Sequence, residues 1–285
     1  MTHEQKTLIQ ECVKEYVTKY ESQAGAAHSL NVSSATISQV LNGNWNAIAE
    51  TMWRTLAKKT CVKQKEWKIA PTSVFKKASG IIKMEKENPN GIRGIIANAS
   101  MGKSTVVDAF SANNGTAYYV RCHRHMRMVD LLRSILRAMG KDSSGNLAEM
   151  LASLVRYLER DNEPVMLLDE VDKLRDEVFE IFIDLENKLN MKCGIVFLGT
   201  PYLKKRIEAG VARGKRGYAE IYSRMRKMFF EINPTQKEFK EDVAVICSLN
   251  GVTDEATIAK FHNQCDNDIR VLRDLITAYK IDTAA

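Results

Sequence analysis

Apolar residues in the first sixty positions recur at the spacing of helices. In residues 4–20 they fall three and four apart, which is the pattern of one buried helix face. They are Leu8, Ile9, Cys12, Val13, Tyr16 and Val17. Shorter apolar groups follow at 23–32, 37–40 and 45–56, each separated from the next by polar residues. The pattern therefore predicts a small all-α domain over residues 1–60.

The stretch 23–43 has the residues that two helices crossing at a steep angle require. Ala27 permits close approach of the helices, and Asn31 tolerates the left-handed conformation of a tight turn. Either Ser33 or Ser34 can cap the second helix. The expected core comprises Ala26, Ala27, Leu30, Val32, Ile37 and Val40, closed by Trp45, Ile48, Met52, Trp53 and Leu56.

From Thr72 onward, helical periodicity alternates with short apolar runs, which predicts an α/β domain with a parallel sheet. The runs predict strands at 91–96, 116–122, 164–169, 193–199 and 228–232. Helices are expected at 73–87, 128–139, 146–159, 236–248, 254–263 and 267–280.

These patterns divide the chain into four parts. Residues 61–71 are basic and lack periodicity, which is more typical of a solvated tether than of a binding site, so we expect a linker there. The α/β domain then occupies 72–233, and an all-helical segment occupies 234–285.

Composition excludes several classes of protein. The chain has 285 residues, of which 45% are hydrophobic and 27% charged, as in ordinary globular proteins. No apolar run approaches the roughly 20 residues that span a bilayer, and no signal sequence opens the chain, so we expect a cytoplasmic protein. Six cysteines lack any Cys-x-x-Cys spacing, which argues against a zinc or disulfide framework. The net charge of +7 permits nucleic-acid binding without demonstrating it.

The segment Gly94–Thr105 has the order of a phosphate-binding loop. An apolar strand leads through small residues to Gly-Lys-Ser-Thr and then to a helix. Lys103 would contact the phosphates of ATP, and Ser104 would ligate Mg²⁺. Ala97 and Ser100 stand where Gly is common, and the alternative is a simple helix cap. The expected nucleotide contacts are Asn98, Ala99, Ser100, Met101, Gly102, Lys103, Ser104 and Thr105.

Two acids end the apolar run at 164–168. Carboxylates at the carboxyl end of a buried parallel strand face the crevice where such sheets bind ligands. Asp169 would therefore complete the Mg²⁺ site with Ser104, and Glu170 would act as the base or orienting group for the attacking water.

The polar residue after the strand at 193–199 suggests a family. This arrangement resembles the AAA+ ATPases, in which such a residue, called sensor 1, contacts the γ-phosphate and the attacking water; here it is Thr200. The resemblance implies an AAA+ P-loop NTPase with a helical lid at 234–285. It also implies that Arg224, or alternatively Arg226, reaches the nucleotide of a neighbouring subunit. Asn267–Arg273 resembles the sensor 2 element, which makes Arg270 a contact to nucleotide in the same chain.

The stretch 23–43 resembles the helix-turn-helix of the Cro and repressor family over its full length. In that family the second helix faces the major groove. The resemblance would place Ser34, Thr36 and Gln39 at the DNA. This face is poor in Arg, so weak or non-specific contacts are expected, and a helical bundle without DNA contact is the alternative.

A helix-turn-helix followed by one AAA+ module resembles the phage Mu B-like family of transposition ATPases. The resemblance implies a protein of the bacterial host cytoplasm that forms homo-oligomeric helical filaments on double-stranded DNA with ATP. It also implies capture of target DNA, recruitment of a transposase, and release on hydrolysis. The alternatives are an insertion-sequence transposition helper, a helicase loader, and a DNA-binding regulator switched by nucleotide.

A filament also requires basic residues that line its pore. Two basic stretches are candidates for backbone contacts, and we expect the second to be a flexible loop because of its glycines. The candidate residues are Arg121, Arg124, Arg127, Lys204, Lys205, Arg206, Arg213, Lys215 and Arg216. The alternative is a solvated charged surface.

Overall fold

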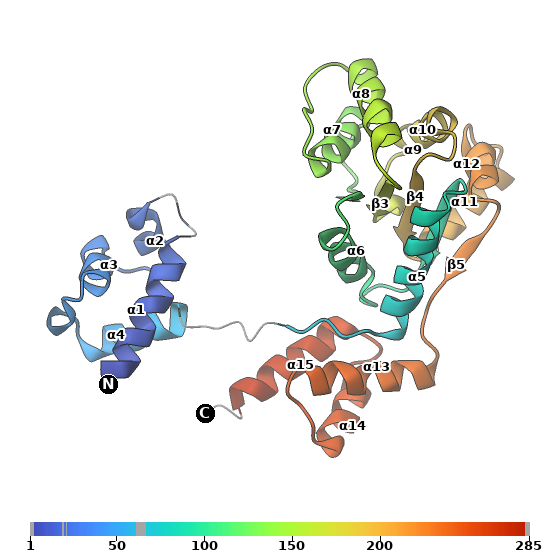
Figure 1. Cartoon of the computed structure of the whole chain (residues 1–285). Coiled ribbons are helices and arrows are strands. Elements are labelled where there is room, and N and C mark those ends of the chain that lie inside the picture. The colour runs from blue at the N-terminus through green and yellow to red at the C-terminus, as the bar shows by residue number, and fades with distance from the viewer. Residues whose placement is uncertain (1–2, 19, 21, 61–66, 283–285) are drawn as a thin grey trace. The chain divides into compact units, whose positions relative to one another are not determined.

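The chain folds into two compact units, Met1–Trp67 and Lys68–Ala285 (Figure 1). The computed structural model describes residues 3–18, 20, 22–60 and 67–282. None of the helices in these ranges is long and apolar enough to cross a membrane.

The smaller unit contains the predicted helices. They are α1 (His3–Val17), α2 (Gln23–Ser29), α3 (Ser34–Leu41), the 3-10 helix η1 (Trp45–Ala47) and α4 (Glu50–Thr60). Asn31 takes the left-handed conformation at φ 52° in the turn between α2 and α3, as predicted. Ser33 is the cap, and its hydroxyl accepts a hydrogen bond from the Thr36 amide at 3.1 Å.

The predicted core of this unit is confirmed. Ala27, Leu30, Ile37, Val40, Trp53 and Leu56 are at most 1% exposed. Val32, Trp45 and Met52 are half-buried and pack against them. The apolar spacing was sufficient here because one face of each helix turns to a common core.

The larger unit is built on a five-stranded parallel sheet of order β2-β3-β4-β1-β5. The strands are β1 (Ile92–Ile96), β2 (Ala117–Arg121), β3 (Val165–Asp169), β4 (Gly194–Gly199) and β5 (Phe229–Glu231). Each lies within one or two residues of its predicted range. Strands β1, β3 and β4 are buried throughout. For β3 and β4 this burial explains why they appear in the sequence as apolar runs, whereas β1 also contains Arg93.

Helices cover the sheet, and its main hydrophobic cluster packs against α7, α8, α10 and α11. The elements after β1 are α6 (Lys103–Ala112), α7 (Met128–Ala138), α8 (Leu147–Arg160), the 3-10 helix η2 (Val171–Lys173), α9 (Asp176–Phe179), α10 (Ile181–Leu189), α11 (Pro201–Ala212) and α12 (Tyr218–Arg224). The sequence pattern predicted α6, α7 and α8 but not α9, α10, α11 or α12.

The carboxyl-terminal helices form a separate group at one end of the larger unit in Figure 1. They are α13 (Gln236–Leu249), α14 (Glu255–Gln264) and α15 (Ile269–Asp282), close to the predicted ranges. They are joined to α5 (Ser73–Glu87), because Asp242 accepts hydrogen bonds from the Ser73 amide at 2.7 Å and the Ser73 hydroxyl at 2.6 Å.

Part of the segment predicted as a linker belongs to the larger unit. The Lys68 amide donates to Asn250 Oδ1 at 3.0 Å, and Asn250 Nδ2 donates to the Lys68 carbonyl at 3.1 Å. Ala70 is buried. Residues 61–66 lie outside the described residues, so the structure bears on the linker prediction for 61–71 only at its carboxyl end.

The prediction of a flexible loop around residues 204–216 is wrong for the first half of that stretch. Lys204, Lys205 and Arg206 lie on α11, whose buried positions are Leu203, Ile207 and Gly210. A Cβ at Gly210 would collide with the Tyr218 ring, so this glycine serves close packing rather than flexibility.

Substitution of Gly210 by Ala is therefore expected to lower the free energy of unfolding by about 1–3 kcal/mol, because the Tyr218 ring must move. The measurement is the midpoint of urea unfolding. Gly80→Ala is the matched control: Gly80 lies in α5, and nothing lies within 4 Å of its added Cβ. It should raise stability by about 0.4–1 kcal/mol. Equal midpoints for the two variants would contradict the packing role of Gly210.

Candidate nucleotide site and the adjoining cationic pocket

The loop between β1 and α6 has an anion-binding geometry. Gly102, the N-cap of α6, takes φ 84°, and no side chain caps the helix. The first amides of α6 are therefore left for a ligand, and the positive end of the helix dipole favours an anion there. Ser100 also takes a left-handed conformation, at φ 62°, although it carries a Cβ.

Lys103 points back into this loop. Its ammonium donates to the carbonyl oxygens of Ala97 and Asn98, both at 2.7 Å, and the residue is only 9% exposed. Burial lowers the pKa of Lys103, which the carboxylate of Asp169 opposes. The cation is thus held where phosphate oxygens would bind.

The other predicted loop residues differ in their contacts and exposure. The Asn98 amide donates to Asn233 Oδ1 at 2.7 Å, so the chain itself uses this donor. Met101 is buried, Ala99 is exposed, and Thr105 lies half-buried in the first turn of α6.

The residues predicted to hold Mg²⁺ lie together. Ser104 Oγ donates to Asp169 Oδ2 at 2.5 Å, and Asp169 is 1% exposed at the end of β3. Among the described residues, no three side chains of His, Cys, Asp or Glu form a metal cage. A hydroxyl and a carboxylate oxygen side by side fit Mg²⁺, which takes oxygen ligands and completes its shell with water and substrate phosphates.

Glu170 follows β3 and is held by two cations. Arg121 donates to Glu170 through Nη2 at 3.0 Å and Nε at 3.2 Å, and Lys173 Nζ lies 2.7 Å from Glu170 Oε2. The Arg121 hydrogen bonds first, and then those of Lys173, lower the pKa of Glu170 to about 2. Arg121 pairs with Glu170 because β2 lies beside β3 in a register that sets Arg121 next to Asp169. Contact of Arg121 with DNA stays a prediction.

Thr200 lies at the centre of the same sheet edge. It follows β4, which runs between β3 and β1, and its hydroxyl donates to Asp172 Oδ2 at 3.2 Å. The sheet order therefore places Thr200 between the phosphate loop and Asp169, as a sensor 1 role requires.

Arg224 is engaged within its own chain. Its Nε donates to Glu186 Oε2 at 3.0 Å and its Nη2 to Asn187 Oδ1 at 2.6 Å, which leaves the side chain 18% exposed. Arg226 is exposed and donates to Asn90 Oδ1 at 3.0 Å. A role of either arginine in a neighbouring subunit stays a prediction.

The start of α15 and the residue before it lie close to the phosphate loop. Arg270 is exposed on α15, and its guanidinium adds to the lowering of the pKa of Lys103. Burial acts to raise the pKa of Asp268, but hydrogen bonds from Ser100 and the Arg270 amide lower it. Arg270 therefore lies on the segment that borders the phosphate loop, where a sensor 2 residue is expected.

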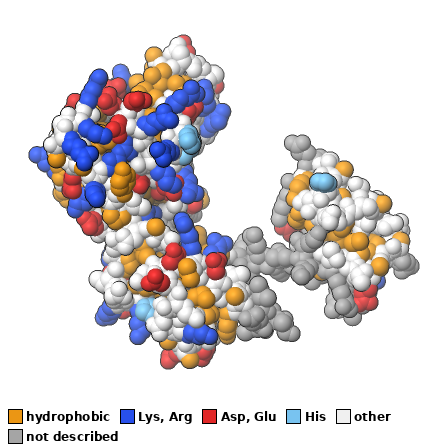
Figure 2. Space-filling model, turned by 180° about the vertical axis from the view of Figure 1, so that it is seen from behind, with side chains coloured by type: hydrophobic (Ala, Val, Ile, Leu, Met, Phe, Trp, Pro, Cys, Tyr) orange, Lys and Arg blue, Asp and Glu red, His pale blue; other side chains and the backbone are white. Residues whose placement is uncertain are grey.

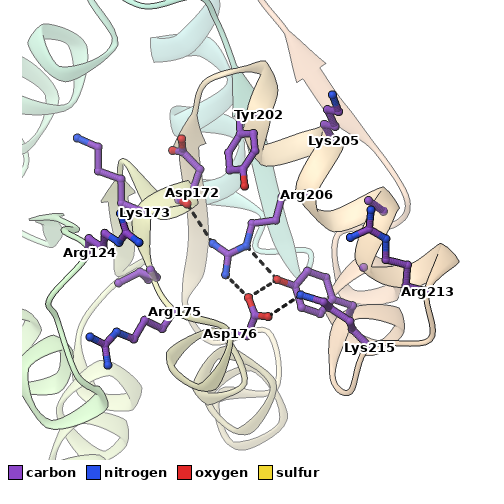
Figure 3. A pocket seen from close by; sticks show the side chains of 14 residues that line it. Arg124, Asp172, Lys173, Arg175, Asp176, Tyr202, Lys205, Arg206, Arg213 and Lys215 are labelled. Carbon is purple, nitrogen blue, oxygen red and sulfur yellow. Dashed lines mark hydrogen bonds and ion pairs between the residues drawn. The ribbon is translucent and has the colours of Figure 1, made fainter.

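A pocket of about 810 Å³ adjoins this site (Figure 3). Its lining includes the cations Arg124, Lys173, Arg175, Lys205, Arg206, Arg213 and Lys215. Only two acids, Asp172 and Asp176, accompany them. Figure 2 shows one face of the larger unit, on which many Lys and Arg side chains lie with acidic side chains among them.

Asp176 is fully engaged within the pocket wall. It accepts hydrogen bonds from Arg206 at 2.5 Å, Tyr218 at 2.6 Å and Lys215 at 3.0 Å. Burial acts to raise the pKa of Asp176, but these three donors hold it well below its usual range. Arg206 also lies 4.8 Å from the centroid of the Phe179 ring, so it is a structural part of the wall.

Four cations of the pocket form no ion pair with any described residue: Arg124, Arg175, Lys205 and Arg213. The structure thus brings together parts of the two predicted basic stretches, which are about 80 residues apart in the chain. The remaining predicted contacts lie elsewhere or are paired: Arg127 with Asp130, Lys204 with Glu231, and Arg216 with Glu180.

Lys173 and Arg175 were missed by the sequence analysis. They directly follow the acidic residues Asp169, Glu170 and Asp172 in the chain. The sequence feature that could have revealed them is the Lys-Leu-Arg stretch after the acidic end of β3. It was overlooked because the neighbouring acidic residues balance its positive charge.

The residues predicted to contact DNA in the smaller unit lie on α3. Ser34 is exposed, whereas Thr36 and Gln39 are half-buried, and the Thr36 hydroxyl lies 2.8 Å from that of Ser33. Helix α3 contains no Lys or Arg. DNA contact by this helix stays a prediction.

Residues 88–207 match the protein family described as "AAA domain". The match includes the phosphate loop, Asp169, Glu170 and Thr200, and it ends before Arg224 and Arg270. With the five-stranded parallel sheet, it shows that the chain has an α/β P-loop NTPase fold, and residues 88–207 are similar to AAA ATPase domains. No curated protein matches the chain.

Proposed function

We propose that this chain is an ATP-hydrolysing, DNA-binding AAA+ protein of the Mu B-like kind, which assembles into filaments on duplex DNA. The observation that carries the ATPase part is the meeting of four groups at one sheet edge: Lys103, Ser104, Asp169 and Glu170. A helix cap would explain the first two residues but not the acids beside them.

Each group has a role in phosphoryl transfer to water. The amides of the loop at 99–105 and the Lys103 ammonium bind the phosphates of ATP. Ser104 and Asp169 would hold Mg²⁺, which neutralises charge on the phosphates. Glu170 orients the attacking water and accepts its proton, while Thr200 orients the same water and the γ-phosphate. Arg270 contributes positive charge from the lid.

The DNA-binding part rests on the pocket. Four cations without ion pairs among the described residues converge there from three segments of the chain. Lys and Arg contacts to phosphates are independent of sequence and weaken steeply with salt. The lack of basic residues on α3 favours the pocket over the helix-turn-helix as the main DNA contact.

The test is electron microscopy with ATP and long duplex DNA. We expect helical filaments with the wild-type chain and none with Lys103→Ala, which removes the phosphate-binding cation. Monomers bound at one operator sequence would refute the proposal and favour a nucleotide-switched regulator. A closed ring without DNA coating would favour a helicase loader. Adding a candidate transposase to preformed filaments then tests recruitment.

Assembly also predicts complementation between two inactive variants. Arg224→Ala and Glu170→Gln subunits should each hydrolyse ATP poorly alone. If Arg224 completes a neighbour's site, a mixture contains sites with an intact Glu170 and an intact Arg224 from different chains. Phosphate release from the mixture should then exceed the sum of the separate variants.

No gain on mixing would assign Arg224 to the structural ion pair with Glu186 alone. The same mixing experiment with Arg226→Ala distinguishes the two arginines, because Arg226 is exposed and its side chain donates to Asn90 rather than to a carboxylate.

A further inference from the structure

Lys173 belongs to both the nucleotide site and the cationic pocket. Its Nζ lies 2.7 Å from Glu170 Oε2, and the same side chain lines the pocket while remaining 49% exposed. In Figure 3, Lys173 and Arg175 lie on one side of the pocket, and Lys205 and Arg213 lie on the other. An anion in the pocket would thus face a cation whose present partner is Glu170.

The element that carries Lys173 makes a second connection between the two sites. Asp172, also on η2, accepts a hydrogen bond from Thr200 through its side chain. Its carbonyl accepts from Arg206 Nη1 at 3.1 Å in the pocket wall. The helix η2 packs against both β4 and α11. The helix η2 therefore lies between the pocket and the nucleotide site. A ligand that moves η2 from the pocket side would act on both Glu170 and Thr200.

The ion pairs of the pocket determine which cation a ligand can recruit. Asp176 is already paired with Arg206 and Lys215 and also accepts from Tyr218, so it leaves the other cations of the pocket without an acidic partner there. The pair between Lys173 and Glu170 is a half-exposed contact three residues apart on one turn, which is the weak kind of ion pair. Arg121 holds the same carboxylate with two hydrogen bonds and does not line the pocket. Lys173 is therefore the partner of Glu170 that a ligand of the pocket can remove.

We propose that a DNA phosphate bound in the pocket takes Lys173 away from Glu170, which removes one of the two cations that restrain this carboxylate and so raises its ability to act on water. This inference rests on the proposed function and adds the route by which DNA stimulates hydrolysis. Lys173 is a positioning residue, since it acts through Glu170. Arg175, which lines the pocket without contacting Glu170, contributes only to DNA affinity.

The test compares ATP turnover with and without saturating duplex DNA of arbitrary sequence. In Lys173→Gln, turnover without DNA rises and the ratio of the two rates falls toward unity, because one restraint on Glu170 is already absent. Lys173→Arg keeps the charge and restores the stimulation ratio. Arg175→Gln shifts half-maximal stimulation to higher DNA concentration but keeps the ratio at saturation. Lys188→Gln, an exposed site on α10 away from the pocket, is the control for removal of one charge.

A Lys173→Gln variant with the wild-type ratio would overturn the inference, as would DNA that binds the wild-type chain without raising turnover. A different result would contradict the proposed function itself: a wild-type chain that neither hydrolyses ATP nor binds duplex DNA. A single-stranded oligonucleotide of the same sequence serves as a separate arm. Stimulation by the single strand alone would overturn duplex DNA as the ligand.

Discussion

Glu170→Gln is expected to lower the turnover number for ATP hydrolysis about 10²–10⁴-fold, because an amide cannot accept the proton of the attacking water. ATP binding should persist, since Lys103 and the loop amides remain. Steady-state phosphate release measures the first effect, and titration with a fluorescent ATP analogue measures the second. Lys103→Ala should instead abolish nucleotide binding itself.

The control is Glu159→Gln, an exposed carboxylate on α8, which should leave both quantities unchanged. Glu170→Gln also removes the partner of two cations, Arg121 and Lys173. Circular dichroism and the unfolding midpoint therefore accompany the kinetics. Turnover comparable to that of the wild-type chain in a folded Glu170→Gln variant would show that another group orients the water.

The elements that bear the nucleotide site could be predicted because each is specified locally. Buried strands β3 and β4 are continuous apolar runs, and the phosphate loop joins such a run to a helix start. The turn at Asn31 and the cap at Ser33 depend on the conformation of single residues. These features need no knowledge of which segments are neighbours.

The surroundings of the site could not be predicted because they depend on neighbours far apart in the chain. Arg121 pairs with Glu170 only because β2 lies beside β3 in one particular register. The pocket requires η2 to pack against α11. Neither the sheet order nor this packing is encoded in the periodicity of a single segment, so the pairing of Arg121 with Glu170 and the place of Lys173 in the pocket were missed.

Short helices were the other limit. Helix α9 has four residues and α12 has seven, which is too short for a 3.6-residue period to appear. In α11 the buried glycine at 210 resembled loop composition, whereas its role is to admit the Tyr218 ring. A glycine therefore predicts flexibility only where no large side chain fills the space that a Cβ would take.

The cationic pocket leads to a prediction about DNA affinity. Lys205→Glu combined with Arg213→Glu should weaken duplex DNA binding on the order of tenfold to a hundredfold at moderate salt. The slope of log affinity against log salt should fall in magnitude by about 2, one unit for each DNA phosphate that the variant no longer binds. Fluorescence anisotropy with a labelled duplex over a salt series measures both quantities.

These two positions separate DNA binding from folding. Neither Lys205 nor Arg213 forms an ion pair with a described residue, so their replacement breaks no ion pair of the wall. Lys204 and Arg206 would be poorer choices, because they pair with Glu231 and Asp176. Lys188→Glu with Lys192→Glu makes the same change in net charge at exposed positions outside the pocket and should leave affinity unchanged. Equal affinity and equal salt slope for the two double variants would exclude the pocket as the DNA-binding surface, while leaving the ATPase assignment intact.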